Sequence, residues 1–375
     1  MKYIVVRVFS LLLTAAVLYG TTACVASPTP SKTVPQGVIV VPGIEEDPSK
    51  GESIYTNPKA SPSAESTKGE ASESTPSSPE PAPPEKTIPQ TERELMMAVE
   101  SCKLPRDSYF ERGEATIVAS QLSDGYAILI RKLVFGRGDD QITCYVADVF
   151  MEDIKDLIGC VFTDEEGKIA EGSPQQVTEQ LNALFVVNTD FMKGRSWGLY
   201  VRGGQVFRQK KTKGIDVCCI KTDGTMQILD GDTLDPDALM AQGDVWHVLT
   251  FGPSLLNEDG SPRDKNSDFR INDNYQGWND DKTYYGFLSP NPRTAMGQAR
   301  DGHYIFAVVD GRDEGYSKGM TFPQLSHLMY EEGCEVAYNL DGGGSVFMYY
   351  DGKAVNSNTG GRNPSDYFVI LKKEG

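Results

Sequence analysis

Residues 339–345, with the sequence Asn-Leu-Asp-Gly-Gly-Gly-Ser, hold the side chains best suited to chemistry. Consecutive glycines weaken a folded element by roughly 0.5–1 kcal/mol each relative to alanine, so a chain keeps them where its backbone must approach another group closely or take a positive φ. Exposed N–H groups in such a turn form an anion-binding concavity. Asp341, Asn339 and Ser345 would place a carboxylate, a carboxamide and a hydroxyl beside it. An Asp-Gly pair is also a common hairpin turn, so this segment alone predicts either a hairpin or an anion site.

Several other polar and glycine-rich motifs occur before and after this segment. They are Val-Asn-Thr-Asp-Phe-Met at 187–192, Phe-Gly-Pro-Ser-Leu at 251–255 followed by Asp259-Gly260, Arg-Thr-Ala-Met-Gly at 293–297, Asp-Gly-Arg at 310–312, Gly-Met-Thr at 319–321, and Arg362. In order and spacing they resemble the phosphodiester glycosidase domain family, which includes the lysosomal enzyme that removes N-acetylglucosamine from a mannose 6-phosphate phosphodiester. The resemblance covers about residues 115–371. Thr189 and Met192 depart from the family's glycine and second aromatic residue, so we expect the cleft wall near Asp190 to differ.

The resemblance implies hydrolysis of a sugar 1-phosphodiester, with release of a free sugar and a phosphomonoester. Its carboxylates would be Asp341, Asp190 and Asp310, one of which activates water or attacks the anomeric carbon; the roles of the three stay open. The expected substrate- and phosphate-binding residues are Asn188, Arg293, Thr294, Arg312, Asn339, Gly342, Gly343, Gly344, Ser345 and Arg362. Arginine suits this task because its planar fork matches two phosphate oxygens. Each aspartate can instead be structural, since Asp-Gly turns are frequent.

Two other functions remain open at this point. A non-catalytic module could bind an envelope glycopolymer through the same cleft, and a phosphodiesterase could cut the P–O bond rather than the C–O bond. The three histidines, His247, His303 and His327, have no metal-ligand spacing and no triad spacing to a serine or cysteine. We therefore expect them to be ordinary packed or surface residues, which argues against a Ser-His-Asp hydrolase.

We expect no required cofactor and no bound metal, with one qualification. The long segment 257–292 is rich in Asn, Asp, Gly and Tyr, and a loop of this length is usually functional. Its acidic residues are Asp264, Asp268, Asp273, Asp280 and Asp281. They could bind Ca²⁺, but they lack EF-hand spacing, so a solvated acidic loop is the favoured interpretation. Aromatic residues in the same loop could stack on sugar rings or cover an edge of the core.

The elements that position these motifs predict an α+β fold with a mixed sheet, many antiparallel hairpins and few helices. Helical patterns occur at 92–101, 174–184, 235–242 and 321–332, with Ser173 and Thr321 as expected N-caps. Residues 304–340 form a β-α-β unit in which the two strands run in the same direction. Asp310 and Asp341 each follow one of these strands, so we expect them at the same sheet edge, where open sheets place ligands.

The first 26 residues have the pattern of an export segment. Positive Lys2 and Arg7 precede an apolar run at 8–18, and small residues follow. The run is short for a membrane span of about 20 residues, although an uncleaved anchor remains possible. Cys24 could instead carry the lipid of a bacterial lipoprotein. All three alternatives place the protein outside the cytoplasm, secreted or anchored to the cell membrane.

Residues 27–92 form a Pro-, Ser-, Thr- and Glu-rich linker that cannot bury enough apolar surface to order itself. The apolar stretch 38–41 is an exception that could pair transiently as a strand, with no evident neighbour. The linker is typical of a stalk that holds a catalytic domain, residues 93–375, away from an envelope. Its substrate would then be an exopolysaccharide or another envelope glycan.

The formal net charge of −17 excludes most nucleic-acid partners, because a phosphate backbone needs a basic patch. Membrane contact is expected only through the N-terminal anchor, and the oligomeric state stays open. Seven cysteines without a C-x-x-C pair are too sparse for a disulfide scaffold and disfavour zinc and thioredoxin-type chemistry. One or two disulfides or buried free thiols are equally compatible with the sequence.

Overall fold

The computed structural model describes residues 38–40, 88–103, 109–110, 112–164, 168–193, 195–271, 288–357 and 361–373. These residues all belong to one compact unit, Pro35–Gly375. The expected export segment at 1–26 and most of the linker lie outside the described residues. Within the described part, no helix has both the length and the apolar character that a membrane span requires.

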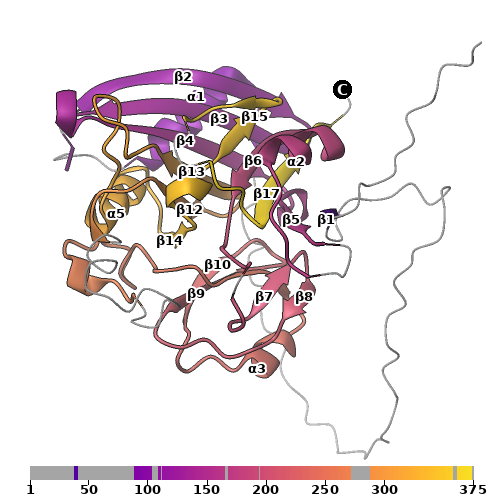
Figure 1. The fold of residues 1–375 in the computed structure, drawn as a ribbon. Helices are drawn as coiled ribbons and strands as arrows, with labels where there is room; N and C mark the ends of the chain where they lie inside the picture. Colours follow the sequence, from indigo (N-terminus) through magenta and orange to yellow (C-terminus); the bar gives the residue numbers. More distant parts are fainter. Residues whose placement is uncertain are drawn as a thin grey trace, which may run out of the picture. The chain divides into compact units, whose positions relative to one another are not determined.

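The first sheet contains both strands of the β-α-β unit, β13 and β14. Its strand order is β14-β12-β13-β4-β3-β2. The strands are β2 (Arg112–Ser123), β3 (Tyr126–Phe135), β4 (Ile142–Met151), β12 (Arg293–Arg300), β13 (His303–Val309) and β14 (Val336–Leu340). Strands β4 and β13 are buried along their whole length, because apolar groups cover both faces of the sheet. Figure 1 shows β2, β3 and β4 running side by side.

Two further sheets complete the fold. One has the order β1-β5-β17-β6-β15-β16, and the other β10-β9-β11-β7-β8. The strands of the former are β1 (Val38–Val40), β5 (Ile158–Phe162), β6 (Ala183–Asn188), β15 (Met348–Tyr350), β16 (Lys353–Ala354) and β17 (Asp366–Leu371). Those of the latter are β7 (Tyr200–Arg202), β8 (Gln205–Arg208), β9 (Asp216–Lys221), β10 (Met226–Asp230) and β11 (Val245–Leu249). Residues of all three sheets, among them Phe185, Ile220 and Phe306, share one apolar core.

The described helices are few and begin at well-defined caps. They are α1 (Glu92–Cys102), α2 (Pro174–Leu181), α3 (Pro236–Met240) and α5 (Phe322–Glu331), with single 3₁₀ turns at Gly138–Asp140, Ile154–Asp156, Asn266–Asp268 and Gly343–Ser345. Ser173 and Thr321 form capping boxes at the starts of α2 and α5, which confirms both predicted caps. Each box satisfies backbone N–H groups that the first turn would otherwise leave unpaired.

The predicted α+β class with few helices is confirmed, and the sheets themselves are antiparallel. Every strand pairing among the described residues is antiparallel. In the first sheet, β12 lies between β13 and β14 and pairs antiparallel with both. These two strands of the β-α-β unit therefore run in the same direction without being neighbours. The linker segment also differs from its expectation: β1 has a neighbour, since it pairs antiparallel with β5.

The loop between β13 and α5 generates a stability prediction. Gly319 has φ +89°, and a Cβ there would lie 2.4 Å from the backbone of Asn291, whereas Gly315 has φ +75° and open space around it. We expect Gly319→Ala to lower the free energy of unfolding by more than about 2 kcal/mol, because backbone strain and steric overlap add. Gly315→Ala, the matched control, should cost only about 1 kcal/mol for strain alone. Urea unfolding of both variants measures the difference; equal losses would contradict the predicted overlap.

Candidate active site

One edge of the first sheet collects several of the predicted site residues. Strands β13 and β14 end there, so Asp310 and Asp341 follow at the same edge, as expected from the β-α-β unit. Strand β12 starts at this edge, since Arg293 pairs with Val309 and Thr294 pairs with Leu340. The topology therefore brings these four residues together although about 50 positions separate the first from the last.

Asp341 is the centre of a compact polar cluster. Its carboxylate is buried and accepts hydrogen bonds from Arg362 Nη2 at 3.1 Å to Oδ1 and 2.9 Å to Oδ2. The backbone N–H of Gly342 donates to Oδ1 at 2.9 Å. Arg362 Nε also donates to Ser345 Oγ at 2.8 Å. Because the Arg362 side chain is 43% exposed, one guanidinium both pairs with the buried carboxylate and faces solvent.

A second arginine acts on the same carboxylate. Arg195 is buried, donates from Nη1 to the carbonyl of Thr250 at 3.0 Å, and lies over the rings of Trp197 and Phe251. Burial raises the pKa of Asp341 above its usual range, and the positive charges of Arg362 and Arg195 limit that rise. A carboxylate with a raised pKa is a better proton acceptor near neutral pH than an ordinary aspartate.

The side chains of Asn188 and Thr294 do not face solvent, and they fix the position of the Asp341 backbone. Both are fully buried. Asn188 Nδ2 donates to the Asp341 carbonyl at 2.7 Å, and Asn188 Oδ1 accepts from Thr294 Oγ1 at 2.8 Å and from the N–H of Phe347 at 3.0 Å. Their contacts are those of positioning residues, which differs from the substrate contact expected from sequence.

The glycine turn packs closely against the start of β12. Gly343 has φ +61° and donates its N–H to the carbonyl of Pro292 at 3.0 Å. A Cβ on Gly342 would lie 2.8 Å from the same carbonyl. The N–H groups of Gly342, Gly343 and Ser345 all have partners inside the protein. Close approach of backbone to backbone therefore explains the first two glycines better than phosphate binding does.

Arg312 stands beside this turn and is exposed. A Cβ on Gly343 would lie 3.4 Å from its guanidinium nitrogens, and its Nε and Nη2 both donate to Asn291 Oδ1, at 3.0 and 2.8 Å. Its φ of +59° is unusual for a residue with a side chain. The backbone and Asn291 thus hold a solvent-facing cation next to the glycine turn.

Asp310 holds a loop in place. Its carboxylate accepts from Asn356 Nδ2 at 2.9 Å, from the Tyr316 hydroxyl at 2.9 Å and from the N–H of Ser357 at 3.0 Å. Burial raises its pKa, and these three hydrogen bonds oppose the rise. With three donors already on a buried carboxylate, the geometry suits loop positioning.

Asp190 lies in a buried ion cluster with Arg202 and Asp366. Arg202 Nη2 contacts Asp190 Oδ2 at 3.1 Å and Asp366 Oδ2 at 2.6 Å, and all three side chains are fully buried. The N–H of Thr250 donates to both oxygens of Asp190. Burial raises the pKa of Asp366. The positive charge of Arg202 lowers it and the negative charge of Asp190 raises it, and the net result is a raised pKa. The cluster orders the backbone that leads from β6 to the site.

Arg293 and Asn339 are also turned inward. Arg293 is buried over the Phe322 ring and donates to the carbonyls of Met320 and Ser289, at 3.0 and 3.1 Å. Asn339 Nδ2 donates to the carbonyl of Gly252 at 2.7 Å. Both residues therefore bind the protein's own backbone, which is how a buried polar group avoids the cost of desolvation.

Comparisons with known proteins place this chain in a family. A family model described as phosphodiester glycosidase matches residues 181–371, just over half of the chain. The chain belongs to the phosphodiester glycosidase family. The matched region contains the Asp341 cluster, the glycine turn and the Arg202 cluster.

One relative and one solved structure extend the comparison. The SPbeta prophage-derived protein YomE of Bacillus subtilis is 29% identical over 167 residues, which is 44% of this chain and 23% of YomE. The match thus spans less than a quarter of that relative. The zebrafish N-acetylglucosamine-1-phosphodiester alpha-N-acetylglucosaminidase catalytic domain, auto-inhibited by its pro-peptide, is 17% identical with a TM-score of 0.53. That match covers 69% of this chain and 88% of the zebrafish chain, and it shows a common fold.

The sequence motifs predict no role for two residues of the cluster. Arg195 follows the Asp190 motif within a polar segment that has no periodic pattern. Phe191 belongs to that motif, and its ring centroid lies 4.8 Å from the Arg362 guanidinium carbon. Phe191 is the sequence signal for this contact, because an arginine commonly stacks on the face of an aromatic ring.

The acidic loop, which we expect to be solvated and for which Ca²⁺ binding is the alternative, is described only in part. Asp264 contacts His327 Nε2 at 2.8 Å, and Asp268 accepts the N–H of Lys265 at 3.0 Å. Asp273, Asp280 and Asp281 lie outside the described residues. Within the described ranges, no group of three or more His, Cys, Asp or Glu side chains is arranged to hold a metal ion.

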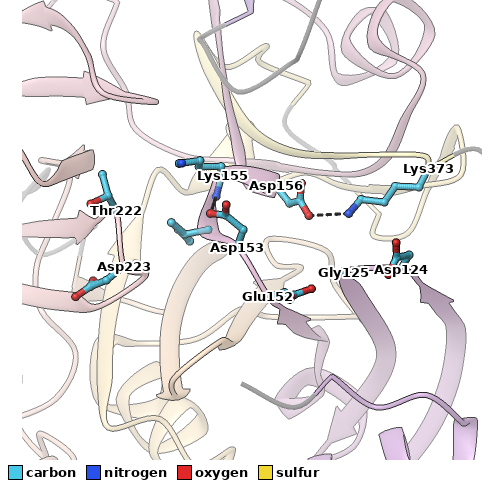
Figure 2. A pocket seen from close by; sticks show the side chains of 10 residues that line it. Asp124, Gly125, Glu152, Asp153, Lys155, Asp156, Thr222, Asp223 and Lys373 are labelled. Carbon is cyan, nitrogen blue, oxygen red and sulfur yellow. Dashed lines mark hydrogen bonds and ion pairs between the residues drawn. The ribbon is translucent and has the colours of Figure 1, made fainter. Parts of the chain in front are cut away.

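A cavity of about 530 Å³ lies away from Asp341. Figure 2 shows its lining side chains, including the ion pair between Lys373 and Asp156. Its residues come from the β2–β3 turn, the segment after β4, the β9–β10 turn and the segment after β17. Since β4 ends opposite the first residue of β13, the cavity is at the other end of the sheet from Asp310 and Asp341.

The Arg202 cluster generates a prediction with a defined pH dependence. Arg202→Met leaves Asp190 and Asp366 buried without their cation, so we expect a loss of about 3–5 kcal/mol in the free energy of unfolding. Without Arg202, the folded-state pKa of Asp366, which burial already raises, rises further above the unfolded value of about 3.9. The loss should therefore be larger at pH 8 than at pH 5, where the folded state can take up protons.

Arg208→Met provides the matched control, because Arg208 is on the neighbouring strand and donates to the carbonyls of Trp197 and Met192. Its loss should be smaller and nearly independent of pH. Thermal unfolding at both pH values measures both variants. An Arg202→Met loss that is the same at pH 5 and pH 8 would show that the two carboxylates do not depend on this cation.

Proposed function

We propose that this protein hydrolyses a sugar 1-phosphodiester, releasing a free sugar and a phosphomonoester. The observation that carries the proposal is the Asp341 cluster: a buried carboxylate with a raised pKa, ion-paired to a half-exposed arginine beside a glycine turn. Family membership supports the reaction class, since the matching family is one of phosphodiester glycosidases.

In the proposed mechanism, Asp341 is the residue that acts at the anomeric carbon, either as the nucleophile or as the base that activates water. A phosphate monoester is a good leaving group, so the leaving oxygen needs little help from a general acid. Arg362 and Arg312 are the solvent-facing cations near the turn and would hold the phosphate. Asp190, Asp310, Asn188 and Thr294 are positioning residues.

Arg362 has a double task in this proposal. Its Nη2 pairs with Asp341 while the rest of its side chain is accessible, so a phosphate could take part of its hydrogen-bonding capacity. The Phe191 ring, 4.8 Å away, limits the orientations of the guanidinium. Because the Arg362 guanidinium would contact both the substrate phosphate and the Asp341 carboxylate, it would offset the repulsion between these two negative groups.

We further propose an extracytoplasmic setting in which the substrate is an envelope or extracellular glycan. The sequence pattern of residues 1–26 and the linker composition support this proposal. The alternative, a non-catalytic module that binds such a glycan, would use the same arginines and leave the phosphodiester intact.

The first test follows the bond that is cut. In ¹⁸O-labelled water, hydrolysis of a panel of sugar 1-phosphodiesters should place the label in the sugar hemiacetal and leave the phosphomonoester unlabelled, because water attacks carbon. Mass spectrometry of both products measures this. Label in the phosphate would establish P–O cleavage instead, and binding without product would establish the non-catalytic alternative.

The second test removes one charge. Asp341→Asn keeps the shape of the side chain, so we expect turnover to fall by roughly 10²-fold or more, the scale of a lost general base. Substrate affinity should hold or improve, because a negative charge near the phosphate disappears. In the wild type, kcat/KM should fall on the acid side at a pH above the usual aspartate range, since burial raises the pKa of Asp341.

Asp351→Asn is the matched control for this test. Asp351 begins the same Asp-Gly dipeptide in the β15–β16 turn, where it is exposed and pairs with Lys372. It has a positive φ that asparagine tolerates, so turnover should be unchanged. If Asp341→Asn also keeps wild-type turnover while remaining folded, Asp341 has no part in the chemistry.

A further inference from the structure

A second polar cluster lies at the opposite end of β13 and is not used by the proposed reaction. Cys102, the last residue of α1, has its Sγ 3.4 Å from His303 Nδ1. His303 Nε2 is 3.0 Å from Asp148 Oδ1. Since β13 runs for seven residues between His303 and Val309, about 20 Å separates this cluster from the Asp341 edge.

The histidine of this cluster is held in one orientation. It is fully buried and stacks on the Phe150 ring, with 3.9 Å between the centroids. Asp148 is itself fixed by Arg131, whose Nη2 is 2.7 Å from Asp148 Oδ2 and 2.6 Å from Glu332 Oε2. Because Asp148 stays ionised beside this arginine, it keeps an N–H on His303 Nε2, and Nδ1 is then aimed at the thiol.

The arrangement matches the physical requirements for an activated thiol. A cysteine nucleophile needs an adjacent base that a third group orients, and here the thiol, imidazole and carboxylate follow one another within hydrogen-bonding distance. Transfer of the thiol proton to Nδ1 gives a thiolate–imidazolium pair that Asp148 stabilises. His303 and Arg300 lower the pKa of Cys102 despite its partial burial. Asp148 and Cys102 together raise the pKa of His303, against the effect of burial.

Cys102 also differs from the other cysteines in its accessibility. Cys102 is a free cysteine that is partly exposed. The other described cysteines are free but buried: Cys144, Cys160, Cys218, Cys219 and Cys334. Burial raises the pKa of each of these five. A soluble reagent should therefore meet one reactive thiol in the folded described part.

We propose that Cys102 is a covalent modification site whose thiolate, held by His303 and Asp148, forms a mixed disulfide with a small-molecule disulfide. In the reaction, the Cys102 thiolate attacks one sulfur of the reagent, a new S–S bond forms, and the reagent's own S–S bond breaks. The leaving sulfur takes the electron pair and then a proton from solvent. Cys102 is oxidised and the small disulfide is reduced to its thiol.

The charged and titratable groups around the thiol come from several elements. They are Glu100 and Lys103 near the end of α1, Arg300 at the end of β12, His303 on β13, Asp148 on β4, Arg131 on β3, and Glu332 and Cys334 after α5. Among these groups, His303 is in hydrogen-bonding contact with Cys102 Sγ. The ordinary pKa of a histidine lies near neutrality. The pH dependence of the reaction therefore tests this contact first.

The experiment uses the full chain carrying Cys24→Ser and the aromatic disulfide 5,5′-dithiobis(2-nitrobenzoic acid) as the probe. We expect one equivalent of released thiolate under native conditions, with the modified peptide containing Cys102. Between pH 8 and pH 6.5, an ordinary thiol with a pKa of about 8.5 loses about 20-fold in rate. Cys102 should lose less than about fivefold. A steep profile, or modification elsewhere in the chain, would overturn the proposal.

His303→Gln tests the partner directly. It should lower the rate at pH 6.5 by about fivefold and restore the steep pH dependence; the factor is modest because a thiolate of higher pKa is a stronger nucleophile. His327→Gln, at a histidine paired with Asp264, is the matched control and should change neither. If His303→Gln does not fold, the wild-type pH profile alone decides. Cys102→Ser should abolish labelling without affecting phosphodiester hydrolysis.

Discussion

The side chain of Asn188 joins the two sheets whose ends make the candidate active site. Asn188 ends β6 in one sheet, while its amide binds the carbonyl of Asp341 and the hydroxyl of Thr294 from the other. The adjacent backbone repeats the link, since the N–H of Asp341 donates to the carbonyl of Thr189 at 2.8 Å. These bonds are fully buried, so breaking one would leave a polar group without water, at about 1–3 kcal/mol. The position of the Asp341 carboxylate depends on this joint.

The three candidate aspartates differ through their surroundings rather than their residue type. Asp190 is paired with Arg202 in a cluster away from solvent. The Asp310 carboxylate accepts three hydrogen bonds from loop residues. Asp341 alone of the three pairs with an arginine that is itself open to solvent. Burial raises the pKa of Asp341 and of Asp310, so a raised pKa by itself does not distinguish a reactive carboxylate from a structural one. The accessible cation makes that distinction.

The two ends of β13 carry different polar chemistry, and one rigid strand separates them. At its start, His303 connects α1 to β4 through a thiol and a carboxylate. At its end, Asp310 fixes the loop after β16. A strand buried along its whole length can hold both clusters in fixed positions, because its backbone groups are paired on both sides and its side chains pack in the core.

The sequence by itself determined the family, the α+β class, the helix caps and the sheet edge that holds Asp310 and Asp341. These depend on local signals: motif order, hydrophobic periodicity, and capping residues such as Ser173 and Thr321, which act within a few positions of themselves. The roles of side chains were decided by the tertiary structure. Arg293, Asn339 and Asn188 were expected to contact substrate, but the fold turns them toward backbone carbonyls of other segments. Cys102 and His303 showed no triad spacing because 201 positions separate them, and only the packing of α1 against the sheet brings them together. Burial and contacts between distant segments set these roles, and neither is encoded in residue spacing.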